Sequence, residues 1–238
     1  MTLLRRMALI ALGAFAAAAV IFAPGAAAYI FPPVPAAKTV MVERTAFTSP
    51  VMADAALRII RPNSFGSAIH IGGGRIVTAA HVVAGAKVVS IKSWDGRFSS
   101  ATVVAIDEKT DLAILQTNMK LLAADMTCGE APVGAPIVSI GNPLGQEFVT
   151  AWGQIAGKPR TVHGMTYYVT DMTVVMGQSG SAVFSNGKVI GITSAVMVAP
   201  LQIPTTDKYV PSLVGFGYVV PSSLVCAMIA KLDAGEGV

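Results

Sequence analysis

Short apolar runs, separated by glycine, asparagine and polar residues, make up most of the chain from about residue 56 onward. Runs of this kind, rich in β-branched residues and bounded by turn-forming residues, predict β-strands. A first set of predicted strands covers residues 67–71, 75–78, 87–91, 101–107 and 112–116. A second set covers residues 137–140, 148–156, 166–170, 181–184, 188–195 and 217–220. The pattern therefore indicates two groups of short strands.

The segments between the strands predict how they are joined. Residues 72–74 are all glycine and residues 185–187 read Ser-Asn-Gly, so both supply the positive φ angles that tight hairpin turns need. Residues 222–232 have the apolar spacing of a helix, with Ser222 or Ser223 as its N-terminal cap. Many short strands and one terminal helix predict an all-β fold of two antiparallel six-stranded β-barrels with a short C-terminal helix.

The first 28 residues differ from the rest of the chain. Hydrophobic residues make up 53% of the sequence and the mean hydropathy is +0.64, and much of this excess lies here. Arg5 and Arg6 precede an apolar run over residues 7–23, and residues 24–28 end in small side chains. This is the pattern of a signal peptide over residues 1–28, or of a membrane anchor through residues 7–23. Either interpretation places the remainder outside the cytoplasm, in the periplasm, secreted or anchored at the membrane.

Residues 29–55 predict a linker, because they hold several prolines and few large apolar side chains. The strand pattern then begins, so residues 56–238 are expected to form one domain. The sequence contains no internal repeat, low-complexity tract or heptad pattern.

The charge balance argues against nucleic acid as a partner. The net charge is +4, and the first 28 residues hold two arginines and no acid, so the rest of the chain carries +2. No cluster of lysine and arginine alternates with aromatic residues, as nucleic-acid-binding surfaces require.

The two cysteines, Cys128 and Cys226, do not have the spacing of a zinc site. The simpler interpretation is a pair of small buried apolar residues, but export would also permit a disulfide between them. Neither a metal nor an organic cofactor is expected.

Three segments supply the residues of serine-nucleophile catalysis in the order histidine, aspartate, serine. His81 follows a predicted strand in Thr-Ala-Ala-His-Val-Val, Asp111 opens the apolar run Leu-Ala-Ile-Leu, and Ser179 lies in Gly-Gln-Ser-Gly-Ser. A serine hydroxyl needs a base beside it, and that base needs a partner to fix its tautomer. A carboxylate at the start of a buried strand also needs a partner, because unpaired burial is costly. The other histidines, His70 and His163, are expected to be structural.

The segments that carry these residues resemble a known family. The resemblance covers residues 66–85, 107–115, 140–157 and 170–194, with a fifth stretch at 215–224. Together they are similar to the protease domain of trypsin-like serine proteases of the HtrA (Deg) type. No single motif is specific, but their order and gaps are typical of the family. The chain ends soon after the predicted helix, so we expect no PDZ domain of the kind that HtrA relatives often carry.

The resemblance implies a chymotrypsin-like double barrel and assigns roles to the site residues. Ser179 would be the nucleophile, His81 the general base and Asp111 the orienting acid. The backbone N–H groups of Gly177 and Ser179 would form the oxyanion hole. The chain departs from the family at Gln178, where asparagine is usual, and at Ser181, where glycine is usual.

The same resemblance locates a substrate-binding pocket. Its expected lining is Thr173, Val174, Ala195 and Val196. Thr173 occupies the position where a tryptic enzyme would have aspartate, so no carboxylate is available to bind lysine or arginine. These residues predict a small apolar pocket that accepts small aliphatic side chains at P1, although ordinary structural roles for them are equally compatible with the sequence.

The sequence therefore predicts an exported serine endopeptidase that hydrolyses peptide bonds of protein substrates through an acyl-enzyme. The alternative is a catalytically silent, protease-like domain that binds peptides or serves as a scaffold; Gln178 and Ser181 would then distort the turn. A maturation protease that acts on a single partner is a third interpretation, against which the export signal argues. Polypeptides are the expected partners. The proline-rich residues 29–50 could also serve a homo-oligomer.

Overall fold

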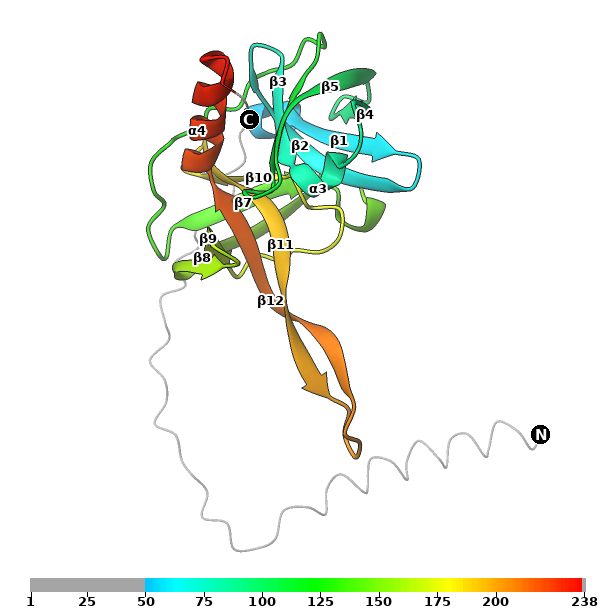
Figure 1. The fold of residues 1–238 in the computed structure, drawn as a ribbon, viewed down its shortest axis with the longest axis vertical. Helices are drawn as coiled ribbons and strands as arrows, with labels where there is room; N and C mark the ends of the chain where they lie inside the picture. The colour runs from blue at the N-terminus through cyan, green and yellow to red at the C-terminus, as the bar shows by residue number, and fades with distance from the viewer. Residues whose placement is uncertain (1–49, 237–238) are drawn as a thin grey trace, which may run out of the picture. The chain divides into compact units, whose positions relative to one another are not determined.

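A computed structural model of the protein describes residues 50–236, and Figure 1 shows its elements in order. The described part begins with helix α2 (Pro50–Ala55), which lies within the segment 29–55 predicted from sequence to be a linker. Met52 and Ala55 of this helix are buried in the core. The predicted signal peptide or anchor lies outside the described residues. Within residues 50–236, no helix has the length and apolar character needed to cross a membrane.

The first six strands form a closed antiparallel barrel. They are β1 (Ala56–Arg61), β2 (Ser64–Gly72), β3 (Arg75–Ala79), β4 (Val88–Ser93), β5 (Phe98–Asp107) and β6 (Leu112–Gln116). The barrel order is β1-β2-β3-β6-β5-β4, and pairing of β4 with β1 closes it. The short helix α3 (Ala80–Val83) directly follows β3. Alternate strand positions point inward, so Leu57, Ile59, Ile76, Ile91 and Leu115 form a buried core.

The other six strands form a second closed barrel. They are β7 (Pro136–Gly141), β8 (Val149–Val162), β9 (Met165–Thr170), β10 (Ala182–Ser185), β11 (Lys188–Gln202) and β12 (Tyr209–Pro221). The order is β10-β11-β12-β9-β8-β7, with β7 paired to β10. A single 3₁₀ turn, η2 (Pro143–Gly145), lies between β7 and β8. The predicted all-β fold of two six-stranded barrels with a terminal helix is therefore confirmed.

A separate apolar cluster joins the two barrels. It contains Ile69, Val77 and Ile114 from the first barrel and Phe184 and Ile192 from the second, all buried. Side chains from both barrels exclude water together here, so this cluster holds the facing strands in a fixed relation.

The terminal helix α4 (Ser222–Asp233) is attached to the barrels by covalent and polar contacts. Cys128 and Cys226 form a disulfide with their Cα atoms 6.0 Å apart, so the simpler expectation of two separate buried cysteines is wrong. The expected serine cap is also wrong, because Pro221 is the N-cap residue and the Ser222 hydroxyl instead donates to the Thr127 carbonyl at 2.5 Å. Arg75 pairs with Asp233 near the end of the helix.

Two parts of the sheet structure differ from the strands predicted by sequence. Strand β1 is absent from the strands predicted by sequence, although the pattern of short apolar runs begins at its first residue. Strand β11 continues past the predicted end at residue 195, and β12 begins before the predicted start at residue 217. The added parts pair as a two-stranded ribbon, shown in orange in Figure 1. The ribbon contains Pro200 and Pro211, the turn between its strands contains Pro204, and its side chains are largely exposed. It therefore lacks the alternation of buried and exposed positions on which strand prediction depends.

Candidate active site

The pairing of β3 with β6 brings His81 and Asp111 together. Ala79, the last residue of β3, pairs with Leu112, the first residue of β6. His81 lies just after β3 and Asp111 just before β6, so the antiparallel register places them side by side. The Ala80 N–H also donates to the Asp111 carbonyl at 3.1 Å. Residues 30 positions apart in the chain therefore meet at one end of the first barrel.

Three donor groups make four hydrogen bonds to the carboxylate of Asp111. His81 Nδ1 lies 3.0 Å from Oδ1 and 2.9 Å from Oδ2, and the His81 backbone N–H donates to Oδ1 at 3.1 Å. The hydroxyl of Ser194, on β11, donates to Oδ2 at 2.5 Å. Burial alone would raise the pKa of Asp111, but the hydrogen bonds from His81 and Ser194 outweigh it and hold that pKa below its ordinary value.

Asp111 adopts an uncommon backbone conformation. Its φ angle is 54°, in the left-handed region that non-glycine residues seldom occupy. Hydrogen bonds to its carbonyl and its carboxylate, both donated from the start of α3, hold this conformation. Such conformations persist where surrounding contacts determine them, and they cluster at functional sites.

The hydrogen bond between His81 Nδ1 and the Asp111 carboxylate also shifts the pKa of His81. The hydrogen bond to Asp111 raises the pKa of the imidazole, burial opposes this, and the negative charge of Asp111 raises it further. The net pKa lies above the ordinary histidine value, while the ring is half exposed, with 52% of its side-chain surface accessible. An imidazole held by a carboxylate at Nδ1 presents its other nitrogen to solvent, which is the arrangement of a general base.

The raised pKa of His81 predicts a specific pH profile. A base must be neutral to accept a proton, so kcat/KM is expected to rise with pH through an apparent pKa above the ordinary histidine value of about 6.5. The check is the initial rate of peptide hydrolysis, measured from pH 5 to pH 9. His163→Asn is the matched control: His163 is exposed with a φ of 50°, a conformation that asparagine tolerates, so its profile should overlay that of wild type. A midpoint below pH 6 would contradict the assignment of His81 as base.

Ser179 lies in the turn that leads into β10, where Ser194 links it to the other two residues. The Ser179 hydroxyl donates to the Ser194 backbone carbonyl at 3.3 Å, and the Ser194 side chain contacts Asp111. Within residues 50–236 no hydrogen bond joins Ser179 to the His81 ring, and such contacts often tighten only when substrate is bound. Sequence reasoning missed Ser194. Its one signal is a serine on the strand that follows the nucleophile turn.

The turn around Ser179 is built on two glycines in the left-handed region. Gly177 has a φ of 94°, and a Cβ there would lie 2.3 Å from the Asn142 carbonyl oxygen. Gly180 has a φ of 86°, and its Cβ would lie 2.1 Å from the Ser67 carbonyl oxygen. Neither position accepts a side chain without moving backbone. The N–H groups of Gly177 and Ser179 have no acceptor among the described residues, which leaves both able to bind a ligand oxygen.

The two departures from the family pattern are accommodated within this turn. Gln178 is buried, and its side-chain oxygen accepts a hydrogen bond from the Val175 N–H at 2.7 Å, which closes the turn. Ser181 is also buried, and its hydroxyl lies 3.0 Å from Thr193 Oγ1 and 2.9 Å from Ser139 Oγ. Both side chains therefore have polar partners, as buried polar groups require.

The expected pocket residues lie on two segments beside the turn. Val174 packs against Gly217, where an added Cβ would lie 2.5 Å from Val174 Cγ2. Gly217 pairs with Val196 across β11 and β12, so the two valines flank the same glycine. The other two predicted residues, Thr173 and Ala195, are exposed. Among the described residues, no group of three or more His, Cys, Asp or Glu side chains is arranged to hold a metal ion.

Comparison with known proteins shows similarity over most of the described part of the chain. The family model described as a trypsin-like peptidase domain matches residues 66–192. The chain is 32% identical over 177 residues to the Serine protease Do-like HtrA of Lactococcus lactis subsp. cremoris, an alignment that covers 68% of this chain and 42% of that protein. It is 28% identical over 180 residues to the Periplasmic pH-dependent serine endoprotease DegQ of Escherichia coli, covering 72% and 37%.

Solved structures agree with these relatives. The structure titled HtrA-type protease AlgW with tripeptide matches with a TM-score of 0.66 at 27% identity, and the match covers 77% of this chain and 62% of that chain. A serine endoprotease from Yersinia pestis matches with a TM-score of 0.63 at 25% identity, covering 76% and 63%. The chain spans about two fifths of the length of the curated relatives named above.

Proposed function

The chain belongs to the trypsin-like peptidase family, as an HtrA-type protease domain, and from this premise we propose that it is a serine endopeptidase that hydrolyses peptide bonds of protein substrates. The observation that carries the proposal is the continuous set of contacts from His81 through Asp111 and Ser194 to Ser179. These contacts join a base, the carboxylate that orients it and a serine hydroxyl.

In the mechanism that we propose, these groups act in the order of serine-protease catalysis. His81 accepts the proton of the Ser179 hydroxyl as its oxygen attacks the substrate carbonyl carbon. The N–H groups of Gly177 and Ser179 stabilise the negative charge on the carbonyl oxygen. The peptide C–N bond then breaks, and His81 donates its proton to the leaving amine. Water, activated by His81, hydrolyses the ester and regenerates the serine.

Asp111 keeps the proton on the Nδ1 nitrogen of His81, so that the other ring nitrogen is free to act as base. It also stabilises the imidazolium that forms during the reaction. Ser194 acts as a positioning residue, because its hydroxyl holds the Asp111 carboxylate while its carbonyl contacts the Ser179 hydroxyl.

The catalytically silent alternative is not favoured. Its motivation was that Gln178 and Ser181 would distort the turn, but both side chains form hydrogen bonds that support it. The three residues that a silent relative would be expected to lack are all present.

An activity-based probe tests the proposal directly. The full chain is incubated with a fluorophosphonate probe, and the labelled residue is identified by mass spectrometry of its peptides. In parallel, unfolded casein serves as a protein substrate. We expect covalent labelling at Ser179 and degradation of casein, because both need a nucleophilic serine and its base. A folded protein that neither becomes labelled nor cleaves casein would refute the enzyme function.

The residues at the expected pocket predict the P1 preference. Thr173, Val174, Ala195 and Val196 carry no charge, so we expect cleavage after Val, Ala, Ile or Leu. Lys, Arg and Glu at P1 should be disfavoured at least about a hundredfold in kcat/KM, because burying an unpaired charge costs several kcal/mol.

A peptide library randomised at P1, with cleavage sites determined by mass spectrometry, measures this preference. Thr173→Asp is the diagnostic variant and should shift the preference toward Lys and Arg if Thr173 lies at the base of the pocket. Dominant cleavage of wild type after Lys, Arg or Glu would contradict the pocket assignment and leave the assignment of the catalytic residues standing.

Relatives named as periplasmic endoproteases support export of this chain as well. We also propose a signal peptide over residues 1–28 or an anchor over residues 7–23, and a homo-oligomer formed through residues 29–50. Of these residues, 1–49 lie outside the described part of the chain.

A further inference from the structure

Ser67, on β2 of the first barrel, contacts the Ser179 turn of the second barrel at two points. Its side chain is fully buried, and its hydroxyl donates to the Gly177 carbonyl at 2.8 Å. Its backbone N–H donates to the Ser179 carbonyl at 2.9 Å. A residue far from the turn in sequence therefore holds the carbonyl groups of Gly177 and Ser179, the two residues proposed to supply the oxyanion-hole N–H groups.

The peptide group between Met176 and Gly177 is held by a residue of the loop between β7 and β8. The Leu144 N–H donates to the Met176 carbonyl at 2.7 Å. In a trans peptide the C=O and N–H groups point in opposite directions, so fixing the Met176 carbonyl also fixes the direction of the Gly177 N–H. That N–H has no acceptor among residues 50–236. Together, the two contacts orient the peptide groups on both sides of Gly177.

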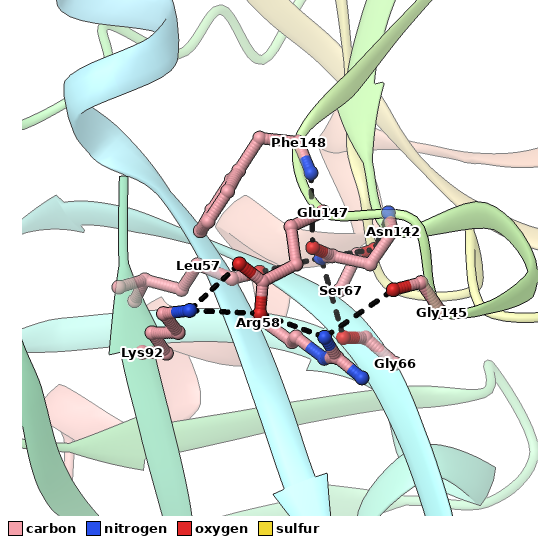
Figure 2. A network of polar contacts seen from close by, with 9 residues as sticks. All are labelled: Leu57, Arg58, Gly66, Ser67, Lys92, Asn142, Gly145, Glu147 and Phe148. Carbon is pink, nitrogen blue, oxygen red and sulfur yellow. Dashed lines mark hydrogen bonds and ion pairs between the residues drawn. The ribbon is translucent and has the colours of Figure 1, made fainter. Parts of the chain in front are cut away.

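Asn142 connects Ser67 to this loop, as Figure 2 shows. The Asn142 backbone N–H and side-chain Nδ2 donate to the Ser67 hydroxyl oxygen at 2.9 Å and 3.1 Å. Nδ2 also lies 3.3 Å from the Leu57 carbonyl oxygen, and the side-chain oxygen accepts from the Phe148 N–H at 3.2 Å. With two donors supplied by Asn142, the Ser67 hydroxyl directs its own hydrogen to Gly177.

Charged residues fix the outer end of the same loop to the first barrel. Glu147 pairs with Arg58 on β1 at 2.8 Å and with Lys92 on β4 at 2.7 Å (Figure 2). Arg58 also lies 3.4 Å from the Gly145 carbonyl oxygen. The loop is thus attached to the first barrel at both of its ends, which keeps Leu144 in place against Met176.

We propose that Ser67 is a positioning residue that sets the direction of the Gly177 peptide groups and so pre-forms the oxyanion-binding turn in the free protein. The proposal rests on the proposed endopeptidase function. It means that the first barrel supplies the support for the oxyanion site as well as the base and its carboxylate. Ser67 acts through Gly177 and does not touch substrate.

Removal of the Ser67 hydroxyl should weaken transition-state stabilisation selectively. In Ser67→Ala, the buried Gly177 carbonyl loses its donor, the Asn142 backbone N–H loses its acceptor, and Asn142 Nδ2 keeps only its backbone carbonyl partners. Glycine tolerates many backbone conformations, so the Gly177 peptide groups then rotate more freely. We expect kcat to fall about tenfold, equivalent to about 1.4 kcal/mol, with KM little changed.

The experiment compares Ser67→Ala with Ser185→Ala in the full chain. Ser185 is a matched control, because its buried hydroxyl also donates to a backbone carbonyl, that of Pro136 at 2.9 Å, within the second barrel. Hydrolysis of one peptide substrate gives kcat and KM, and a peptide aldehyde measures affinity for a tetrahedral adduct. Only Ser67→Ala should lose kcat and aldehyde affinity together. The apparent pKa of kcat/KM should stay as in wild type, because Ser67 contacts neither His81 nor Asp111.

A second measurement does not depend on activity. Hydrogen exchange of the ¹⁵N-labelled Gln178 amide, which belongs to the same peptide as the Gly177 carbonyl and donates to the Val175 carbonyl at 3.1 Å, should be faster in Ser67→Ala than in wild type, and unchanged in Ser185→Ala. Ser67→Cys keeps a weak donor in nearly the same volume, so its exchange rate should lie between those of wild type and Ser67→Ala. It replaces Ser67→Ala if that variant does not fold. Equal losses of kcat in Ser67→Ala and Ser185→Ala, or unchanged exchange of the Gln178 amide in Ser67→Ala, would overturn the positioning role. Wild type without activity or labelling would overturn the endopeptidase function, and the exchange data would then still decide the role of Ser67.

Discussion

Ser179→Ala is expected to lower kcat about 10⁶-fold, because the variant has no nucleophile to form the acyl-enzyme. The fold should be unaffected: among residues 50–236 the hydroxyl makes one hydrogen bond, of 3.3 Å, and the methyl group of alanine fits where the serine side chain lay. The residual rate then comes from substrate binding and from the N–H groups of Gly177 and Ser179, which the substitution retains.

The measurement is kcat for a peptide substrate, with thermal unfolding as the check that the variant remains folded. His81→Ala supplies the matched comparison, because a base and the nucleophile that it activates act as a unit. The double variant should therefore lose little more than either single one. If Ser179→Ala retained a tenth of the wild-type kcat, another residue would have to be the nucleophile.

Asp111→Asn is expected to lower kcat about 10⁴-fold while leaving the structure in place, because an amide at this position holds the wrong tautomer of His81. Asparagine has nearly the same shape as aspartate and tolerates the left-handed conformation that Asp111 adopts, so the backbone geometry should be kept. Loss of the negative charge also removes the contact that raises the pKa of His81, so the residual activity should have a lower pH midpoint than wild type.

The control for this variant is Asp107→Asn, an identical substitution in the same turn. Asp107 accepts hydrogen bonds from the backbone N–H groups of Lys109 and Thr110, and has no contact with His81. Its kcat and pH midpoint should match those of wild type. Activity of Asp111→Asn within tenfold of wild type would show that Asp111 is not the orienting acid.

The contact between His81 and Asp111 could be anticipated from sequence because local patterns define both positions. His81 follows one buried apolar run and Asp111 precedes another, and the strands that carry these runs are regular enough to recognise. The fold class followed from the same runs and from the glycine turns at residues 72–74 and 185–187, where the expected positive φ angles are found.

Other features depend on contacts between distant segments, which no local pattern reveals. Ser194 and Ser67 are ordinary serines in sequence, and their importance arises only when β11 approaches Asp111 and β2 approaches Gly177. The pairing of Cys128 with Cys226 could not be decided either, since spacing alone does not bring two cysteines together. The Gln178 side chain had suggested a distorted turn, because its hydrogen bond to Val175 could not be foreseen.

The disulfide has a consequence for where the protein reaches its full stability. Cys128 and Cys226 are 98 residues apart, and all six strands of the second barrel lie between them, so the bond closes that barrel into a covalent ring. In the chain-entropy view, closing a loop of this size destabilises the unfolded chain by about 4.7 kcal/mol. A reducing cytoplasm withholds that contribution from the half of the molecule that carries Ser179. The barrel with His81 and Asp111 lies outside this loop, so the disulfide directly constrains only the barrel that carries Ser179.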